Sequence, residues 1–165
     1  MTRTQQAWEL LESIPDPEIP VVSIRELGIL REVTEHDGML EIVITPTYSG
    51  CPAMGQIEDD VRAALAANGI EARVVTRLAP AWTTDWITPE AREKLRAFGI
   101  APPHTAVADN VVRFARRTEQ AHAQVVCPRC GSANTTETSH FSSTACKALY
   151  KCLDCLEPFD HFKPY

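Results

Sequence analysis

Five of the six cysteines lie after residue 126, and four of them form two Cys-x-x-Cys pairs, Cys127 with Cys130 and Cys152 with Cys155. A tight turn lets both sulfurs of such a pair face the same metal ion, and two pairs are typical of a tetrahedral zinc ribbon. So short a segment needs a metal or disulfides to fold. The pattern predicts a structural zinc site. A four-cysteine iron site, unliganded cysteines and two disulfides are the alternatives.

The fifth clustered cysteine, Cys146, stands six residues before the second pair and next to Lys147. A free cysteine can serve as a small buried apolar side chain. It can also contact a metal that is handled as substrate, or a partner protein. Both interpretations of Cys146 stay open.

Cys51 stands apart from the others and is followed by Pro52, a residue that suits the first position of a helix. This order predicts that Cys51 caps the following helix. Helix N-termini carry unpaired N–H groups and a positive dipole end, so we expect a lowered thiol pKa and a reactive sulfur. The alternative is an ordinary capping or buried cysteine.

Two carboxylates, Asp16 and Glu18, lie in a proline-stiffened turn at residues 16–20. They could form a metal or proton site. Residues of this kind also form turns and cap helices, which is the alternative.

The elements that must position these residues follow from periodicity and from turn signals. Apolar residues recur at helical spacing in residues 4–14, 54–65 and 88–98, and β-rich or alternating runs occupy residues 29–36, 39–45 and 70–78. Asp37 and Gly38 between the first two runs are typical of a type I′ hairpin. The order predicts an α/β (α+β) fold, a small α-β-β-α-β sandwich followed by a four-cysteine zinc ribbon. Residues 107–114 leave room for one more strand.

The chain is long enough for one ordinary domain with a small appendage. We place the boundary between residues 118 and 124, which predicts a first domain at residues 1–120 and the ribbon at residues 121–165. The acidic and basic residues balance from residue 127 onward, so the whole net charge of −6 belongs to the first part.

The amino-acid composition and net charge disfavour some classes of protein function. The protein is 44% hydrophobic and 23% charged, which is typical of a packed globular chain. A net charge of −6 disfavours a nucleic-acid-binding module, which needs a cationic face. The sequence has neither a secretory signal nor a membrane-spanning run, and this predicts a cytoplasmic protein with reduced cysteines and no membrane partner.

Several motifs together resemble a known family. Residues 16–20, 26–29, 45–53, 127–131 and 143–152 resemble the PaaD family of bacterial phenylacetate degradation. The first half is similar to the wider SufT-like family, which is associated with iron-sulfur cluster assembly and whose reactive cysteine matches Cys51. The ribbon is the addition specific to the PaaD family.

The resemblance implies a role in the multicomponent phenylacetyl-CoA epoxidase, which forms the ring 1,2-epoxide. The implied partners are its diiron oxygenase subunit, its flavin and iron-sulfur reductase, and general iron-sulfur assembly proteins. We expect a metallocentre maturation factor, an accessory protein or subunit rather than a stand-alone enzyme. Iron or an iron-sulfur cluster would sit transiently at Cys51, with Asp16, Glu18, Thr47 and Cys146 as further binding residues.

Two other functions remain. The chain could be a stoichiometric component of the epoxidase, in electron transfer or coupling, although it lacks the Glu-x-x-His pairs of a diiron bundle and any flavin or nucleotide motif. A zinc-ribbon module for nucleic acid is the least favoured, because the ribbon is neutral and the main domain acidic.

Overall fold

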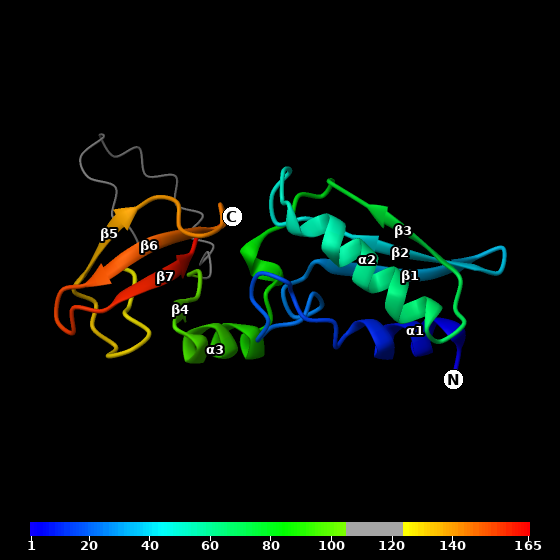
Figure 1. Cartoon of the computed structure of the whole chain (residues 1–165), viewed down its shortest axis with the longest axis horizontal. Coiled ribbons are helices and arrows are strands. Elements are labelled where there is room, and N and C mark those ends of the chain that lie inside the picture. The colour runs from blue at the N-terminus through cyan, green and yellow to red at the C-terminus, as the bar shows by residue number, and fades with distance from the viewer. Residues whose placement is uncertain (105–123) are drawn as a thin grey trace, which may run out of the picture. The chain divides into compact units, whose positions relative to one another are not determined.

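The computed structural model describes residues 1–104 and 124–165 (Figure 1). Contacts divide the chain into two compact units, the first made of Met1–Lys94 with Tyr165 and the second of Leu95–Pro164. Each unit is described by itself below. The strand expected at residues 107–114 and all but the last residue of the boundary expected at residues 118–124 lie outside the described residues.

The first helix, α1, spans Arg3–Leu11 and begins with a capping box. The Thr2 hydroxyl accepts the Gln5 backbone N–H, and the Gln5 side chain accepts the Thr2 N–H in return. Its apolar stripe is buried at Ala7 and Leu11. The predicted helix is confirmed and ends a few residues early, because the chain turns into the proline-stiffened segment.

A three-stranded sheet forms the centre of the first unit, in the order β1-β2-β3. β1 (Leu30–His36) and β2 (Met39–Ile44) pair antiparallel as a hairpin. Asp37 and Gly38 have φ angles of 51° and 80°, the left-handed conformations that a type I′ turn requires at both central positions. The hairpin prediction is confirmed.

The second helix crosses from β2 to a parallel strand. α2 spans Ala53–Ala66 and leads into β3 (Ala72–Thr76), which pairs parallel with β2. α2 buries Ile57, Val61 and Leu65, as its stripe predicted. Because α2 follows β2 directly, the connecting loop with Cys51 lies at the carboxyl end of β2, a common place for ligand sites in such units.

A short 3₁₀ turn, η1 (Thr84–Trp86), precedes α3 (Pro89–Phe98). The Thr88 hydroxyl accepts the Ala91 N–H and so caps the start of α3. Phe98 departs from the expected apolar face: it is 53% exposed. It is the last residue of α3, where the helix ends at Gly99 with a φ of 95°.

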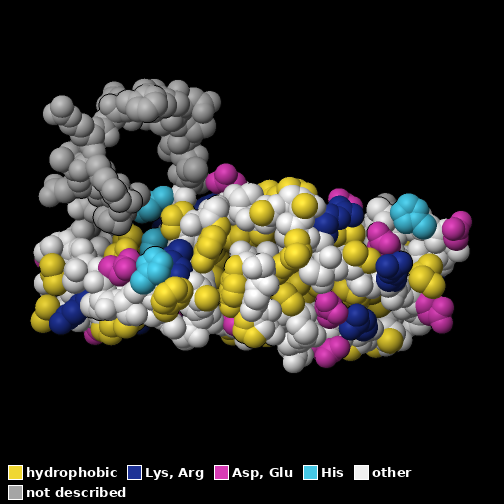
Figure 2. All heavy atoms as spheres, turned by 90° about the horizontal axis from the view of Figure 1, so that it is seen from above, with side chains coloured by type: hydrophobic (Ala, Val, Ile, Leu, Met, Phe, Trp, Pro, Cys, Tyr) yellow, Lys and Arg dark blue, Asp and Glu magenta, His cyan; other side chains and the backbone are white. Residues whose placement is uncertain are grey.

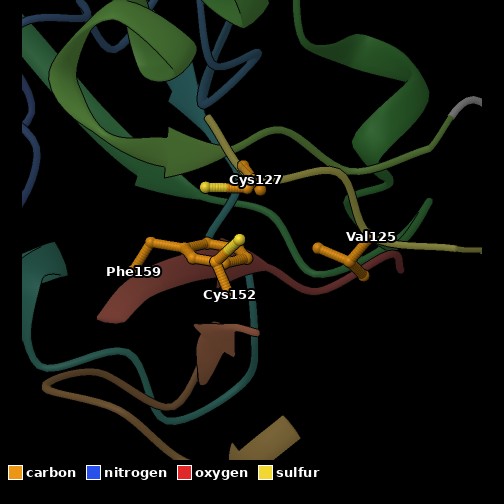
Figure 3. Packing of buried hydrophobic residues seen from close by; sticks show 5 residues of the cluster. Val125, Cys127, Cys152 and Phe159 are labelled. Carbon is orange, nitrogen blue, oxygen red and sulfur yellow. The ribbon is translucent and has the colours of Figure 1, made fainter. Parts of the chain in front are cut away.

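The second unit contains a four-stranded sheet in the order β4-β7-β6-β5. Its strands are β4 (Ile100–Ala101), β5 (Thr135–Ser139), β6 (Lys147–Cys152) and β7 (Pro158–Phe162). β5, β6 and β7 pair antiparallel, and β4 adds a short parallel edge to β7. Figure 3 shows Cys127 and Cys152 beside Val125 and Phe159 in the buried cluster of this unit. The mixed α+β class and the ribbon are confirmed.

The surface carries charges of both signs. On the face that Figure 2 shows, dark blue and magenta side chains are interspersed over the described residues and do not form a continuous basic surface. Within residues 1–104 and 124–165, no helix is both long and apolar enough to cross a membrane.

Candidate functional site

The four cysteines of the two Cys-x-x-Cys pairs meet at one point of the second unit. Their sulfur atoms all lie within 4.8 Å of one another, with Sγ–Sγ separations of 3.8 Å for Cys127 and Cys155 and 3.5 Å for Cys130 and Cys152. A tetrahedral ion with zinc–sulfur bonds of about 2.3 Å separates its sulfurs by about 3.8 Å. The donor set and its spacing therefore fit one tetrahedral metal ion. All six cysteines are free, so the disulfide alternative is wrong.

Each pair is shaped by a turn that ends in a left-handed residue. In the first, the Gly131 N–H donates to the Cys127 carbonyl (2.9 Å), and Gly131 has a φ of 77°. In the second, the Cys155 N–H points at the Cys152 sulfur (3.5 Å), and Leu156 has a φ of 65°. Hydrogen bonding from this N–H lowers the pKa of Cys152 to about 7. The thiolate that a metal requires is thus favoured at this position.

A polar network ties the two turns together. The Ser132 hydroxyl and the Asn134 amide (2.8 Å) both donate to the Asp154 carboxylate, and the Leu153 N–H donates to the Asn134 carbonyl (2.8 Å). The hydrogen bonds from Ser132 and then Asn134 lower the pKa of Asp154. No pattern in the sequence predicted this network of hydrogen bonds. The only available signal was the presence of short polar residues around each pair.

Cys51 lies just outside α2 and does not cap it as predicted. Pro52 is the N-cap residue, already in a helical conformation, and the helix begins at Ala53. A turn closed by the Cys51 N–H on the Tyr48 carbonyl (3.2 Å) delivers the cysteine to this end of the helix. The sulfur still accepts a hydrogen bond from the Ala53 N–H, so it reaches the first free donor of α2.

The expected lowering of the Cys51 pKa is wrong. Burial raises the pKa of this half-buried thiol, and the nearby carboxylates of Glu18 and Asp16 raise it further. The Ala53 N–H and the Thr47 hydroxyl oppose the shift and do not reverse it. The helix end is visible in the sequence, whereas the burial of the thiol and its two neighbouring negative charges depend on the folded chain.

The structure thus brings four of the predicted site residues together in the first unit: Cys51, Thr47, Asp16 and Glu18. Asp16 also forms the turn that the alternative interpretation described. It is 6% exposed, and its carboxylate accepts the N–H groups of Glu18 (2.9 Å) and Ile19 (2.8 Å). The turn holds the carboxylates beside the thiol.

Cys146 does not join the four-cysteine cluster. It precedes the first residue of β6, whereas Cys152 is the last, which separates them by about 20 Å of extended chain. The Cys146 side chain is 3% exposed, with the Thr144 hydroxyl 3.1 Å from its sulfur. These surroundings match the interpretation of Cys146 as a small buried apolar side chain.

Comparison with known proteins finds a matching family for each half of the chain. The PaaD zinc beta ribbon domain matches residues 112–163, and the iron-sulfur cluster assembly protein family matches residues 4–76. A protein of Escherichia coli (strain K12), named as one of the subunits of a "Putative 1,2-phenylacetyl-CoA epoxidase", is 49% identical over 98% of this chain and 93% of its own length.

The first half alone has relatives of its own. An "Fe-S protein maturation auxiliary factor" of Bacillus subtilis (strain 168) is 36% identical over 50% of this chain and 82% of that protein. A crystal structure titled "Domain of Unknown Function DUF59" from Bacillus anthracis is 31% identical and covers 56% of this chain and 90% of that one, with a TM-score of 0.52.

Proposed function

The chain belongs to the PaaD family of phenylacetyl-CoA epoxidase proteins, and we propose that it matures a metal centre of that epoxidase by passing iron or an iron-sulfur cluster through Cys51. The proposal includes a cytoplasmic setting and contact with the oxygenase or reductase subunit, and with general iron-sulfur assembly proteins. The iron-sulfur assembly match over residues 4–76 and the relatives named as maturation factors support it.

The observation that carries the proposal is the environment of the Cys51 thiol. The sulfur is half-buried, accepts hydrogen bonds from the Thr47 hydroxyl and the Ala53 N–H, and lies in the field of the Glu18 and Asp16 carboxylates. Two nearby negative charges disfavour a free thiolate and favour a cation at the same place. The site is therefore matched to an iron cation, whereas an isolated anionic nucleophile would be unstable there.

This electrostatic arrangement couples metal arrival to proton release. While the site is empty, the raised pKa keeps the sulfur as S–H. An arriving iron ion takes the place of the proton, the sulfur binds as thiolate, and the proton leaves to water. Removal of the iron by a client with more ligands allows the sulfur to take up a proton again. The exchange is reversible and needs no oxidant or reductant.

We propose that the four-cysteine site holds zinc in a structural role. Four sulfur donors at these separations accept either zinc or iron, and the zinc ribbon domain matched to residues 112–163 favours zinc. A bound zinc would fix the two turns against each other. In this proposal the ribbon recognises the client protein and Cys51 handles the metal.

The test is a cell-based comparison of Cys51→Ser with Cys146→Ser. Serine at position 51 can keep the hydrogen bond to Ala53 while it removes the soft ligand. We expect folded, zinc-loaded Cys51→Ser protein, and epoxidase purified from those cells with reduced iron content. The Cys146→Ser control should yield normally loaded epoxidase. Fully metallated epoxidase from Cys51→Ser cells would contradict the proposal.

A stoichiometric role is the second candidate, because the relative with 49% identity is named as a subunit. The two functions differ once the epoxidase has been assembled. A maturation factor is dispensable in the assay of purified, metal-replete oxygenase and reductase, whereas a coupling or electron-transfer component is needed in every turnover. Activity that is near zero without this chain and returns only when it is added back would favour the component.

A further inference from the structure

A second potential binding site lies in the ribbon unit, separate from the four sulfurs. A cavity of about 290 Å³ opens between the end of α3, the first Cys-x-x-Cys turn and strands β6 and β7. This volume is near the lower end of the range for pockets that bind small organic molecules. A ligand of about one aromatic ring with a short substituent matches it.

The walls of the cavity are mostly apolar. They are formed by Phe98, Ile100, Leu149, Pro158 and Phe159. Phe98 is 53% exposed at the end of α3, although its ring is a large apolar surface. An apolar group bound in the cavity would cover part of this ring and gain the free energy of removing it from water.

Two cations line the same cavity, Arg129 and Lys147. Arg129 lies between the cysteines of the first turn, with its guanidinium beside Gly99, where a Cβ would come within 3.4 Å of it. Within the described parts of the chain, the Arg129 side chain forms no hydrogen bond or ion pair. A guanidinium carries five N–H donors and binds a carboxylate through two parallel hydrogen bonds.

Lys147 is 5% exposed, which is rare for a lysine. Its ammonium pairs with the Asp160 carboxylate at 3.5 Å, longer than the 2.7–2.9 Å that is typical of a charge-assisted hydrogen bond. Asp160 also accepts the Ser142 hydroxyl. With two cations and one carboxylate, the cavity carries a net charge of about +1, in a protein of net charge −6. That balance suits a ligand with a single negative charge.

We propose that this cavity binds a small monocarboxylate that carries an apolar group. Arg129 holds the carboxylate, Lys147 adds positive potential, and the apolar group lies against Phe98, Leu149 and Pro158. The site is independent of Cys51 and of metal transfer. The same chemistry is offered by a free aryl or alkyl carboxylic acid and by the last residue of a partner chain when that residue is apolar.

The experiment is a titration of the full-length, zinc-loaded protein followed by the backbone amide NMR signals. Benzoate is the charged probe, and benzamide is its neutral isostere. We expect saturable shifts at Gly99 and Leu149 with benzoate, and binding at least tenfold weaker with benzamide. A short peptide that ends in phenylalanine, with a free or an amidated carboxyl end, forms the second arm. Tighter binding of the free-ended peptide than of benzoate would identify a partner's chain end as the source.

Arg129→Gln is the test variant, because its side chain is exposed and is not a metal ligand. We expect it to weaken benzoate binding at least tenfold at unchanged zinc content. Lys151→Gln is the control, because it removes one exposed positive charge of β6 that does not line the cavity. This variant should bind benzoate as tightly as the unmodified protein does. The proposal is overturned if neither carboxylate saturates these signals, if benzamide binds as well as benzoate, or if Arg129→Gln binds as tightly as Lys151→Gln.

Discussion

Gly131 and Leu156 occupy the same position in the two Cys-x-x-Cys turns, directly after the second cysteine, and both adopt a left-handed backbone, with φ angles of 77° and 65°. Glycine enters this conformation without cost, whereas a residue with a Cβ loses about 1–2 kcal/mol. Leu156 is 64% exposed, so its packing within the described chain offsets little of that cost.

We therefore expect Leu156→Gly to raise the stability of the zinc-loaded protein by up to about 1 kcal/mol, because the relieved strain exceeds the entropy that glycine loses on folding. Chemical unfolding monitored at the ribbon measures the change. Gly131→Ala is the opposite substitution and should destabilise by about 1 kcal/mol. A loss of stability in Leu156→Gly would show that the leucine side chain contributes more than the strain costs.

The metal site predicts about one equivalent of zinc per chain, because its four thiolates complete one tetrahedral ion. Cys130→Ser should lose the metal and unfold the ribbon, while the first unit keeps its own core and stays folded. Metal analysis together with circular dichroism measures both effects. Cys146→Ser is the control and should retain its zinc. Well-folded protein that contains no metal would contradict the structural role.

Loss of the hydrogen bonds that Asp154 accepts should weaken metal binding less than loss of a cysteine ligand does. Asp154→Ala removes the acceptor for Ser132 and Asn134, which loosens one turn relative to the other. We expect metal affinity to fall about tenfold, within the range seen when groups that orient metal ligands are removed. Competition with a chromophoric chelator measures it. Glu157→Ala alters a nearby exposed side chain outside this network of hydrogen bonds and should have no effect.

The raised pKa of Cys51 predicts slow alkylation at neutral pH, slower than that of a cysteine in an unstructured peptide. Glu18→Gln removes one of the two charges that oppose the thiolate, so the pKa should fall and the rate at pH 7 should rise. Glu9→Gln, in α1, is the control for a general change in net charge. The pH dependence of the alkylation rate, monitored by mass spectrometry at Cys51, supplies the measurement. A lower rate in Glu18→Gln would contradict the electrostatic argument.

Because the pKa of the buried His161 is lowered, we expect the protein to lose stability in acid. Burial, with the neighbouring His104, lowers the pKa of His161 to about 4, and the Nε2 atoms of both rings are buried without a hydrogen-bond partner among the described residues. Since the folded pKa lies below the unfolded value, the unfolded chain binds the proton more tightly. Stability is then complete above about pH 6.5 and falls as the pH drops towards 4, by roughly 3 kcal/mol at most.

His161→Phe should flatten this pH dependence, because a phenyl ring can remain beside Tyr150 and does not titrate. Urea unfolding of zinc-loaded protein between about pH 7.5 and about pH 5.5 compares the two chains while the metal remains bound. His36→Gln alters an exposed histidine of the first unit and should keep the unmodified slope. Parallel slopes for His161→Phe and the unmodified protein would exclude His161 as the cause.

The sequence by itself determined the helices and strands of the first unit and the spacing of the four clustered cysteines. Spacing within each Cys-x-x-Cys pair, the Asp37-Gly38 turn and the apolar stripe of α2 are local signals, because they depend on neighbouring residues and on backbone geometry. The motifs at residues 16–20, 26–29, 45–53, 127–131 and 143–152 together were sufficient to indicate the family.

Only the tertiary structure decided the direction of the Cys51 pKa shift and the existence of the cavity in the ribbon unit. The pKa of Cys51 depends on burial and on carboxylates more than thirty residues earlier in the chain, so an argument from the helix end alone had the wrong sign. Likewise, Arg129 and Lys147 come from separate segments and line one cavity only after β6, β7 and the first turn have packed. Electrostatic effects depend on distance in space, which spacing along the chain does not supply.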